Sequence, residues 1–121
     1  MRRQKFGRIV MFSSMAARTG GVNAAHYAAS KGGVLGLMRS LAVETATENI
    51  RVNSISPVIT DTPMPRAVVS EEYLQSRKNQ IPLGRIGNVQ DMTEACMFLL
   101  SNESSYMLGQ DLRVNGGSTL W

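Results

Sequence analysis

Three short stretches of the chain are runs of apolar and β-branched residues that are typical of strands. They span residues 8–13, 50–56 and 110–114, and they are followed by Ser14, Pro57 and Asn115 respectively. Each of these following residues favours a turn or interrupts a ladder of hydrogen bonds. The first run is apolar almost throughout, as in strands that are buried on both faces of a parallel sheet. The pattern therefore predicts three strands.

A long helix is predicted between the first two strands. From residue 24 to residue 47 the chain contains no proline, and apolar residues recur at helical spacing, at Leu35, Met38, Leu41 and Ala42. Asn49 is the predicted end of this helix. Three glycines interrupt the pattern, and each weakens a helix by roughly 1 kcal/mol relative to alanine. Because of this cost, we expect Gly32, Gly33 and Gly36 to pack closely against another backbone.

Two shorter helices are predicted before the third strand. Residues 70–80 form a polar helix, with Ser70 as N-cap and two acids in the first turn. Asn88 caps a second, amphipathic helix with Asp91 at its third position. The predicted apolar stripe of that helix consists of Val89, Met92, Cys96, Leu99 and Leu100. Residues 15–24 and 58–66 are rich in small residues, glycine or proline, and they are predicted to be loops.

The order of these elements is strand, helix, strand, helix, helix, strand. Strands that alternate with helices of this length imply right-handed crossovers and an α/β fold, with a parallel sheet and helices on its faces. The first strand would lie at an exposed edge, which is an aggregation hazard. We therefore expect that a neighbouring strand is missing from residues 1–121 and that they form a single partial domain.

Composition narrows the class of protein. A chain of 121 residues with 43% hydrophobic and 18% charged residues fits one globular unit and disfavours disorder, collagen-like repeats and coiled coils. No charge-free apolar stretch has the roughly 18 residues of a membrane span, and residues 1–5 lack a hydrophobic signal core. The single Cys96 cannot form an internal disulfide. We expect a cytoplasmic protein without a membrane partner.

The net charge of +4 raises the question of a nucleic-acid partner. Basic residues cluster only near the N-terminus, at Arg2, Arg3, Lys5 and Arg8. Such a cluster before an apolar strand is more often a helix end, where cations complement the helix dipole. The few aromatic residues are not interleaved with the basic ones, so we expect no nucleic-acid binding.

The first candidate for chemistry is the pair Tyr27 and Lys31. The two residues are one helical turn apart, so their side chains share a face of the long helix. A phenol has a pKa near 10, and a cation held beside it favours the phenolate. By chance alone, this spacing has a probability of about 0.07, which is a real false-positive risk for a short motif.

Two further segments are predicted to lie beside this pair. Ser14 follows the first strand, and residues 57–62 follow the second. In open α/β sheets, ligands bind outside the carboxyl ends of the strands. Ser14, Tyr27 and Lys31 are therefore predicted to share one site with the segment after Pro57.

Four stretches of the chain resemble the short-chain dehydrogenase/reductase family. They are residues 7–14 with the strand-ending serine, residues 27–31 with the tyrosine and lysine, residues 49–57, and residues 109–117. Their order and spacing match the C-terminal half of that family over nearly the whole chain, and the general character is most similar to its 3-oxoacyl-(acyl-carrier-protein) reductases. The resemblance implies the C-terminal part of a Rossmann-like doubly wound sheet.

The resemblance also implies an activity. The implied activity is that of an NAD- or NADP-dependent oxidoreductase. Its implied substrate is a small molecule with a ketone or a secondary alcohol. Tyr27 would protonate the carbonyl oxygen, Ser14 would hydrogen-bond the same oxygen, and Lys31 would hold the nicotinamide ribose. Thr62 would bind the carboxamide of the cofactor. Tyr27, Lys31, Pro57, Val58, Ile59 and Thr62 are the implied cofactor-binding residues.

Two features of the chain depart from the family pattern. Val58 stands where the family usually has glycine, and a β-branched residue tolerates a positive φ poorly. None of the 11 glycines forms the G-x-G-x-x-G phosphate turn. We therefore expect residues 1–121 on their own to bind the cofactor poorly and to be inactive.

Alternative interpretations remain for three features. The glycine-containing helix could instead serve a non-catalytic fragment that pairs with itself or with a longer relative, and the family resemblance implies a homo-oligomer. His26 adjoins Tyr27 but is expected to be an ordinary helix residue rather than a proton relay. Asp61, Glu71 and Glu72 lack an accompanying His or Cys, so no metal site is predicted.

Overall fold

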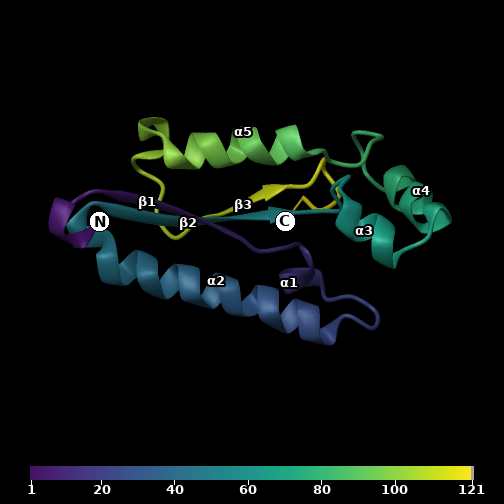
Figure 1. Cartoon of the computed structure of the whole chain (residues 1–121), viewed down its shortest axis with the longest axis horizontal. Helices are drawn as coiled ribbons and strands as arrows, with labels where there is room; N and C mark the ends of the chain where they lie inside the picture. Colours follow the sequence, from purple (N-terminus) through teal and green to yellow (C-terminus); the bar gives the residue numbers. More distant parts are fainter. Residues whose placement is uncertain (121) are drawn as a thin grey trace.

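The computed structural model describes residues 1–120, which form an α/β unit of three layers. Among these residues, the sheet has three parallel strands in the order β1 (Gly7–Phe12), β2 (Ile50–Pro57) and β3 (Asp111–Val114). Helix α2 (Ala25–Thr45) covers one face of the sheet and α5 (Val89–Leu100) covers the other (Figure 1). The predicted fold class and all three predicted strands are confirmed, with strand ends shifted by one residue.

Helix α2 packs through the apolar positions that the sequence pattern singles out. Leu35, Met38 and Ala42 are buried against Ile50 and Val52 of β2, and Leu41 packs partly against the same cluster. The helix continues into the short 3-10 helix η2 (Ala46–Glu48). Asn49 then ends the helical segment with a left-handed φ of 55°, a conformation that asparagine tolerates.

The three glycines of α2 do not pack as expected. A Cβ at Gly32, Gly33 or Gly36 would meet no atom within 4 Å. The expectation of close backbone packing is therefore wrong within the described chain, because no other part of residues 1–120 packs against these three glycines. The neighbouring Leu37 is 54% exposed and Val43 is 80% exposed.

Helix α5 begins with a capping box. The Asn88 side chain accepts a hydrogen bond from the Asp91 backbone, and the Asp91 carboxylate accepts one from the Asn88 backbone. Met92 and Leu99 are buried against Ile55 of β2, with Cys96 partly buried beside them. The predicted stripe is too wide at both ends, because Val89 and Leu100 are exposed.

Two segments that were predicted to be loops contain short helices. Helix α1 (Ala16–Thr19) is a single turn that ends at Gly20, and α3 (Pro63–Val68) begins with a proline. Proline suits the first turn of a helix, where its missing N–H would have no partner. The loop prediction holds for residues 58–62 and is wrong for 63–66, because Pro63 begins a helix there instead of breaking one.

The remaining helices agree with the sequence pattern. Helix α4 (Glu71–Asn79) begins at Ser70, whose hydroxyl accepts from the Tyr73 backbone. Of the basic N-terminal residues, Arg2 and Arg3 lie on the 3-10 helix η1 (Arg2–Gln4), Lys5 follows it and Arg8 lies on β1. A third 3-10 helix, η3 (Asn102–Ser104), follows α5 and was not predicted. Arg2 and Lys5 both pair with the carboxylate of Glu48, at 3.4 and 3.7 Å. These basic residues therefore neutralise an acid of the chain itself.

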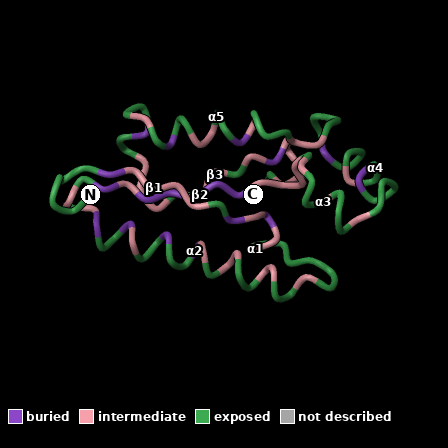
Figure 2. The backbone as a smooth tube through the Cα atoms, viewed as in Figure 1, coloured by how far each residue is buried: buried purple, intermediate pink, exposed green. Residues whose placement is uncertain are grey.

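Strand β1 lies at one edge of the sheet. It pairs with β2 on one side, and no strand among residues 1–120 pairs with its other side. Its residues are mostly half-buried, and Phe12 is 44% exposed (Figure 2). Within that range, every helix is too short or too polar to cross a membrane.

Candidate active site

The site begins where the chain leaves β1. Ser13 donates its backbone N–H to Ile55 at 2.8 Å, and Met15 donates its own to Pro57 at 3.0 Å, so the segment after β1 stays attached to β2. Ser14 lies between these two anchors and is half-buried. Its hydroxyl oxygen accepts a hydrogen bond of 3.1 Å from the backbone of Ala16, the first residue of α1. Ser14 therefore has a fixed place at the carboxyl end of β1.

Helix α2 is attached to the same place through one residue, Lys31. The Ser13 hydroxyl donates to the Lys31 carbonyl oxygen at 2.9 Å, and the Lys31 ammonium donates to the Phe12 carbonyl oxygen at 3.0 Å. Both contacts join the second turn of α2 to the last residues of β1. They determine how far α2 is shifted along the sheet.

Tyr27 and Lys31 lie together on this turn. The Lys31 ammonium is 5.9 Å from the centre of the Tyr27 ring, which is within the range of a cation–π contact. Both side chains are half-buried. Tyr27 and Lys31 therefore share one face of α2, as predicted.

The segment after β2 is held on the opposite side from β1. Val58 donates its N–H to Val114 at 3.4 Å, and the Asp61 N–H donates to Gly87 at 2.7 Å. Among residues 1–120, the non-glycine residues with positive φ are Lys5, Asn23 and Asn49. Val58 is thus free of the backbone strain that its β-branched side chain predicts for a left-handed conformation.

The predicted site residues lie on three segments. Lys31 is hydrogen-bonded to the end of β1, and the Tyr27 ring lies beside its ammonium. Ser14 lies on the segment that the Met15 N–H joins to Pro57. Ile59 and Thr62 lie farther along the segment that leads into α3, where Thr62 precedes the first helical residue. In the described chain, no hydrogen bond joins Ser14 to Tyr27, or Thr62 to either of them.

A family model for enoyl-(acyl carrier protein) reductase matches residues 1–119. The chain belongs to the short-chain dehydrogenase/reductase family. It is 43% identical to the 3-oxoacyl-(acyl-carrier-protein) reductase of Aquifex aeolicus and 38% identical to that of Escherichia coli. It is 41% identical to the acetoacetyl-CoA reductase of an Acinetobacter species. Each match covers 97% of this chain but only 47–48% of the relative, so the chain spans about half the length of the curated relatives it matches.

A solved structure of another short-chain dehydrogenase/reductase shares the fold. It is a 7α-hydroxysteroid dehydrogenase complexed with NADH and 7-oxo-glycochenodeoxycholic acid. The TM-score is 0.93 at 36% identity, and the match covers 97% of this chain and 46% of that chain. The expected Rossmann-like architecture is therefore confirmed.

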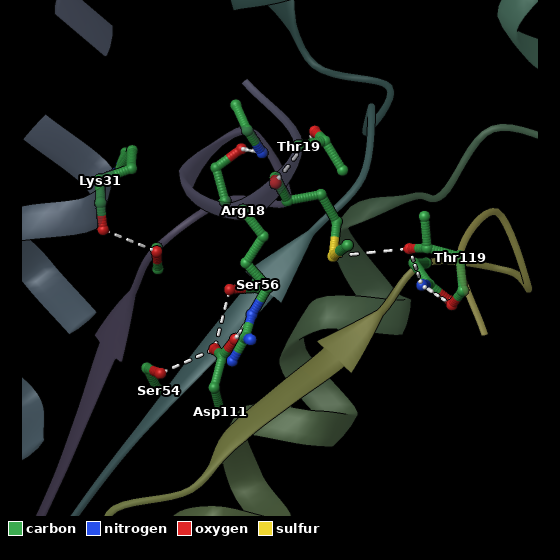
Figure 3. A network of polar contacts seen from close by, with 12 residues as sticks. Arg18, Thr19, Lys31, Ser54, Ser56, Asp111 and Thr119 are labelled. Carbon is green, nitrogen blue, oxygen red and sulfur yellow. Dashed lines mark hydrogen bonds and ion pairs between the residues drawn. The ribbon is translucent and has the colours of Figure 1, made fainter. Parts of the chain in front are cut away.

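One polar cluster of this short-chain dehydrogenase/reductase chain was not predicted from the sequence. The Asp111 carboxylate accepts from the hydroxyls of Ser54 and Ser56 at 2.7 and 2.8 Å, and from the Arg18 guanidinium at 3.2 Å (Figure 3). Ser54 and Ser56 alternate along β2, so they point to the same face of the sheet. This alternation could have shown from the sequence that the two serines lie together. Their contact with Asp111 could not have been predicted, because it depends on the register of β3 against β2.

A small cleft lies between α3 and α4. Its volume is about 150 Å³, and it is lined by Asp61 of the segment before α3, by Arg66 of α3, and by Glu71 and Lys78 of α4. Arg66 lies 2.9 Å from Asp61 and 3.5 Å from Glu71. The hydrogen bond from Arg66 lowers the pKa of Asp61 from its ordinary value. These ion pairs connect the segment after β2 to α4, beyond the carboxyl edge of the sheet (Figure 1).

Proposed function

We propose that the chain provides the proton-transfer side of an NAD- or NADP-dependent oxidoreductase that reduces a ketone or oxidises a secondary alcohol. One observation carries the proposal. Lys31 is held at the end of β1 by both its carbonyl and its ammonium, and it lies beside the Tyr27 ring. The same strand end leads directly into Ser14. We infer that the Tyr27 phenol, the Ser14 hydroxyl and the Lys31 ammonium act together at this edge of the sheet.

The names of the relatives support a substrate class. Two of the matched proteins are 3-oxoacyl-(acyl-carrier-protein) reductases, and a third is an acetoacetyl-CoA reductase. These names share a 3-oxoacyl thioester as the group to be reduced. We propose a substrate of this class for the present chain.

The residues of the chain would act on the carbonyl oxygen of the substrate. The Tyr27 hydroxyl donates its proton to that oxygen, and the Ser14 hydroxyl donates a hydrogen bond to it. Positioned proton transfer typically contributes about 10²–10⁴-fold to the rate, and a fixed donor stabilises the developing negative charge. The Lys31 ammonium stabilises the phenolate that remains. In alcohol oxidation, Tyr27 accepts the proton instead.

The residues present fit the nicotinamide end of a dinucleotide. When bound, such a cofactor supplies or accepts the hydride. An ammonium has three donors, and Lys31 uses one of them on Phe12 within the described chain, so two are available for ribose hydroxyls. The Thr62 hydroxyl, which forms no hydrogen bond to residues 1–120, would bind the carboxamide. The unstrained backbone of Pro57, Val58 and Ile59 would line the same end.

On their own, residues 1–121 are proposed to turn over little or no substrate. They contain no G-x-G-x-x-G turn to bind the pyrophosphate. The test uses purified chain, acetoacetyl-CoA and NADH or NADPH, and follows the loss of reduced-nicotinamide absorbance. A rate typical of enzymes, about 1 s⁻¹ or more, would overturn this part of the proposal.

The chemical roles are tested in a fusion that supplies the missing turn. The glycine-rich half of the Aquifex aeolicus relative is joined in front of residue 1, and the same assay is applied. We expect Tyr27→Phe to reduce kcat by at least about 10²-fold. Tyr106→Phe is the matched control, because the Tyr106 side chain is fully exposed. If Tyr27→Phe retains full activity, the assignment of Tyr27 as proton donor is wrong.

A second role is supported by the outer face of α2. Gly32, Gly33 and Gly36 leave space for a closely packed partner, and Leu37 and Val43 expose apolar surface on the same helix. We propose that a second copy of the chain packs there, which makes the protein a homo-oligomer. Light scattering with size-exclusion chromatography tests this. Gly36→Arg should convert a dimer to a monomer, whereas a wild-type monomer at all concentrations would contradict it.

A further inference from the structure

The Asp111 carboxylate has an unusual position for a charged group. Its side chain is only 3% exposed, and the serines that contact it, Ser54 and Ser56, are fully buried. A buried carboxylate is costly unless hydrogen bonds and a counter-charge compensate for it. Both serine hydroxyls donate to Oδ1, and the Arg18 Nε donates to Oδ2. In the part of the chain that the structure describes, Arg18 is the cation paired with Asp111.

The two serines orient the carboxylate. Because both donate to the same oxygen, the other oxygen is directed away from β2 and toward α1. Figure 3 shows the Arg18 side chain reaching across the end of β2 to meet it. The contact therefore joins the last strand of the sheet to the segment that carries Ser14.

Other contacts also hold this segment. Helix α1 is a single turn, which is too short to be stable without tertiary contacts. Met15 is buried and attaches the beginning of α1 to Pro57, and Ala17 packs against the core cluster of α2 and β2. Arg18 adds the polar side-chain anchor at the end of α1, next to Gly20 and Gly21.

We propose that Arg18 and Asp111 are positioning residues. Their ion pair holds α1 on the sheet and thereby fixes the place of Ser14 at the carboxyl end of β1. The relevance of this place to catalysis rests on the proposed function. The ordering of the segment itself does not depend on any reaction, so it can be measured separately.

The experiment compares amide hydrogen exchange in the 121-residue chain without cofactor or substrate. Arg18→Met removes the donor and keeps the length of the side chain. We expect exchange in the peptide 14–20 to rise by roughly tenfold or more, because a hydrogen bond to a charged group is lost. The peptide 92–100 of α5 is the internal control and should not change.

Two conservative variants separate positioning from general destabilisation. Arg18→Gln places a carboxamide N–H at the same bond distance from the backbone as Nε, so we expect it to retain most of the protection. Asp111→Asn still accepts from both serines but presents an N–H to the guanidinium, and it should raise exchange in 14–20. The double variant Arg18→Gln/Asp111→Asn pairs two carboxamides and should restore protection.

Three results would overturn the proposal. They are unchanged exchange in 14–20 for Arg18→Met, an equal rise in α5, and a double variant no more protected than Asp111→Asn alone. Each is independent of the fusion assay. Failure of the Tyr27 test would remove the proposed reaction but would leave the ordering result in place.

Discussion

The Lys31 ammonium lies 3.0 Å from the carbonyl oxygen of Phe12, the last residue of β1. The Ser13 hydroxyl donates to the Lys31 carbonyl oxygen nearby, so two hydrogen bonds of one residue join α2 to the strand end. This arrangement brings the Tyr27 ring next to a positive charge without a contact between the phenol oxygen and the sheet.

Replacement of Lys31 should therefore affect both position and charge. In the fused enzyme, Lys31→Met is expected to reduce kcat by about 10²-fold or more, because the phenolate loses its stabilising charge and the ribose its donor. Steady-state kinetics at saturating substrate measure this effect. Lys5→Met is the matched control, since Lys5 pairs only with Glu48 near the N-terminus. Equal rates for the two variants would contradict the role of Lys31.

Truncation of two adjacent side chains of α2, Leu37 and Met38, should affect stability very differently. Met38 is fully buried, so Met38→Ala is expected to reduce the free energy of unfolding by about 2–5 kcal/mol. Leu37 is 54% exposed, and Leu37→Ala should change the free energy of unfolding by about 0.5 kcal/mol or less. Urea denaturation of the 121-residue chain measures both. Similar losses for the two variants would mean that α2 is rotated about its axis, with a face other than that of Met38 turned toward the sheet.

Gly116 should be essential for the contact between the C-terminal turn and the start of the α4–α5 connection. It has a φ of 59°, and a Cβ there would lie 2.6 Å from the Ile81 Cγ2. Gly84 has a similar φ of 68° but open space around it. We expect Gly116→Ala to reduce the free energy of unfolding by about 1–3 kcal/mol more than Gly84→Ala, because only the former adds a steric clash. Equal losses would show that backbone conformation alone accounts for the cost.

The N-terminus of α5 should give a defined dependence of stability on pH. Hydrogen bonds from Arg85, and then one from the Asn88 backbone, lower the pKa of Asp91 from 3.8 to about 2. A lowered pKa in the folded state means that the carboxylate stabilises the fold above pH 3.8 and loses this effect as the pH falls toward 2. The difference in unfolding free energy between wild type and Asp91→Asn should therefore shrink over this range. A difference that stays constant down to pH 2 would contradict the assigned pKa.

The helix and strand pattern was predictable wherever one period extends over several turns or a whole strand. Leu35, Met38 and Ala42 repeat over two turns of α2, and the capping pair Asn88 and Asp91 marks the start of α5 unambiguously. Helix α1 has only one turn, so no period can develop in it. Its residues are helical because the segment is attached to Pro57 and Asp111.

The candidate site was predictable only in part. Tyr27 and Lys31 are close because helical spacing alone brings them together, and Ser14 follows from the end of a strand. Asp111 gave no such signal, since its partner Arg18 lies 93 residues away and the contact depends on which strand borders β2. The open surroundings of Gly32, Gly33 and Gly36 likewise depend on which side of α2 packs on the sheet.

Because Arg18 and Asp111 are 93 residues apart in the sequence, their contact forms late during synthesis of the chain. A nascent chain that has emerged only as far as β2 can already pair β1 with β2 and dock α2, since those contacts lie within its first 57 residues. The counter-charge for Arg18 is translated later, with β3. The turn after Ser14 therefore becomes fully rigid only after β3 has joined the sheet, although the turn itself is translated well before that strand.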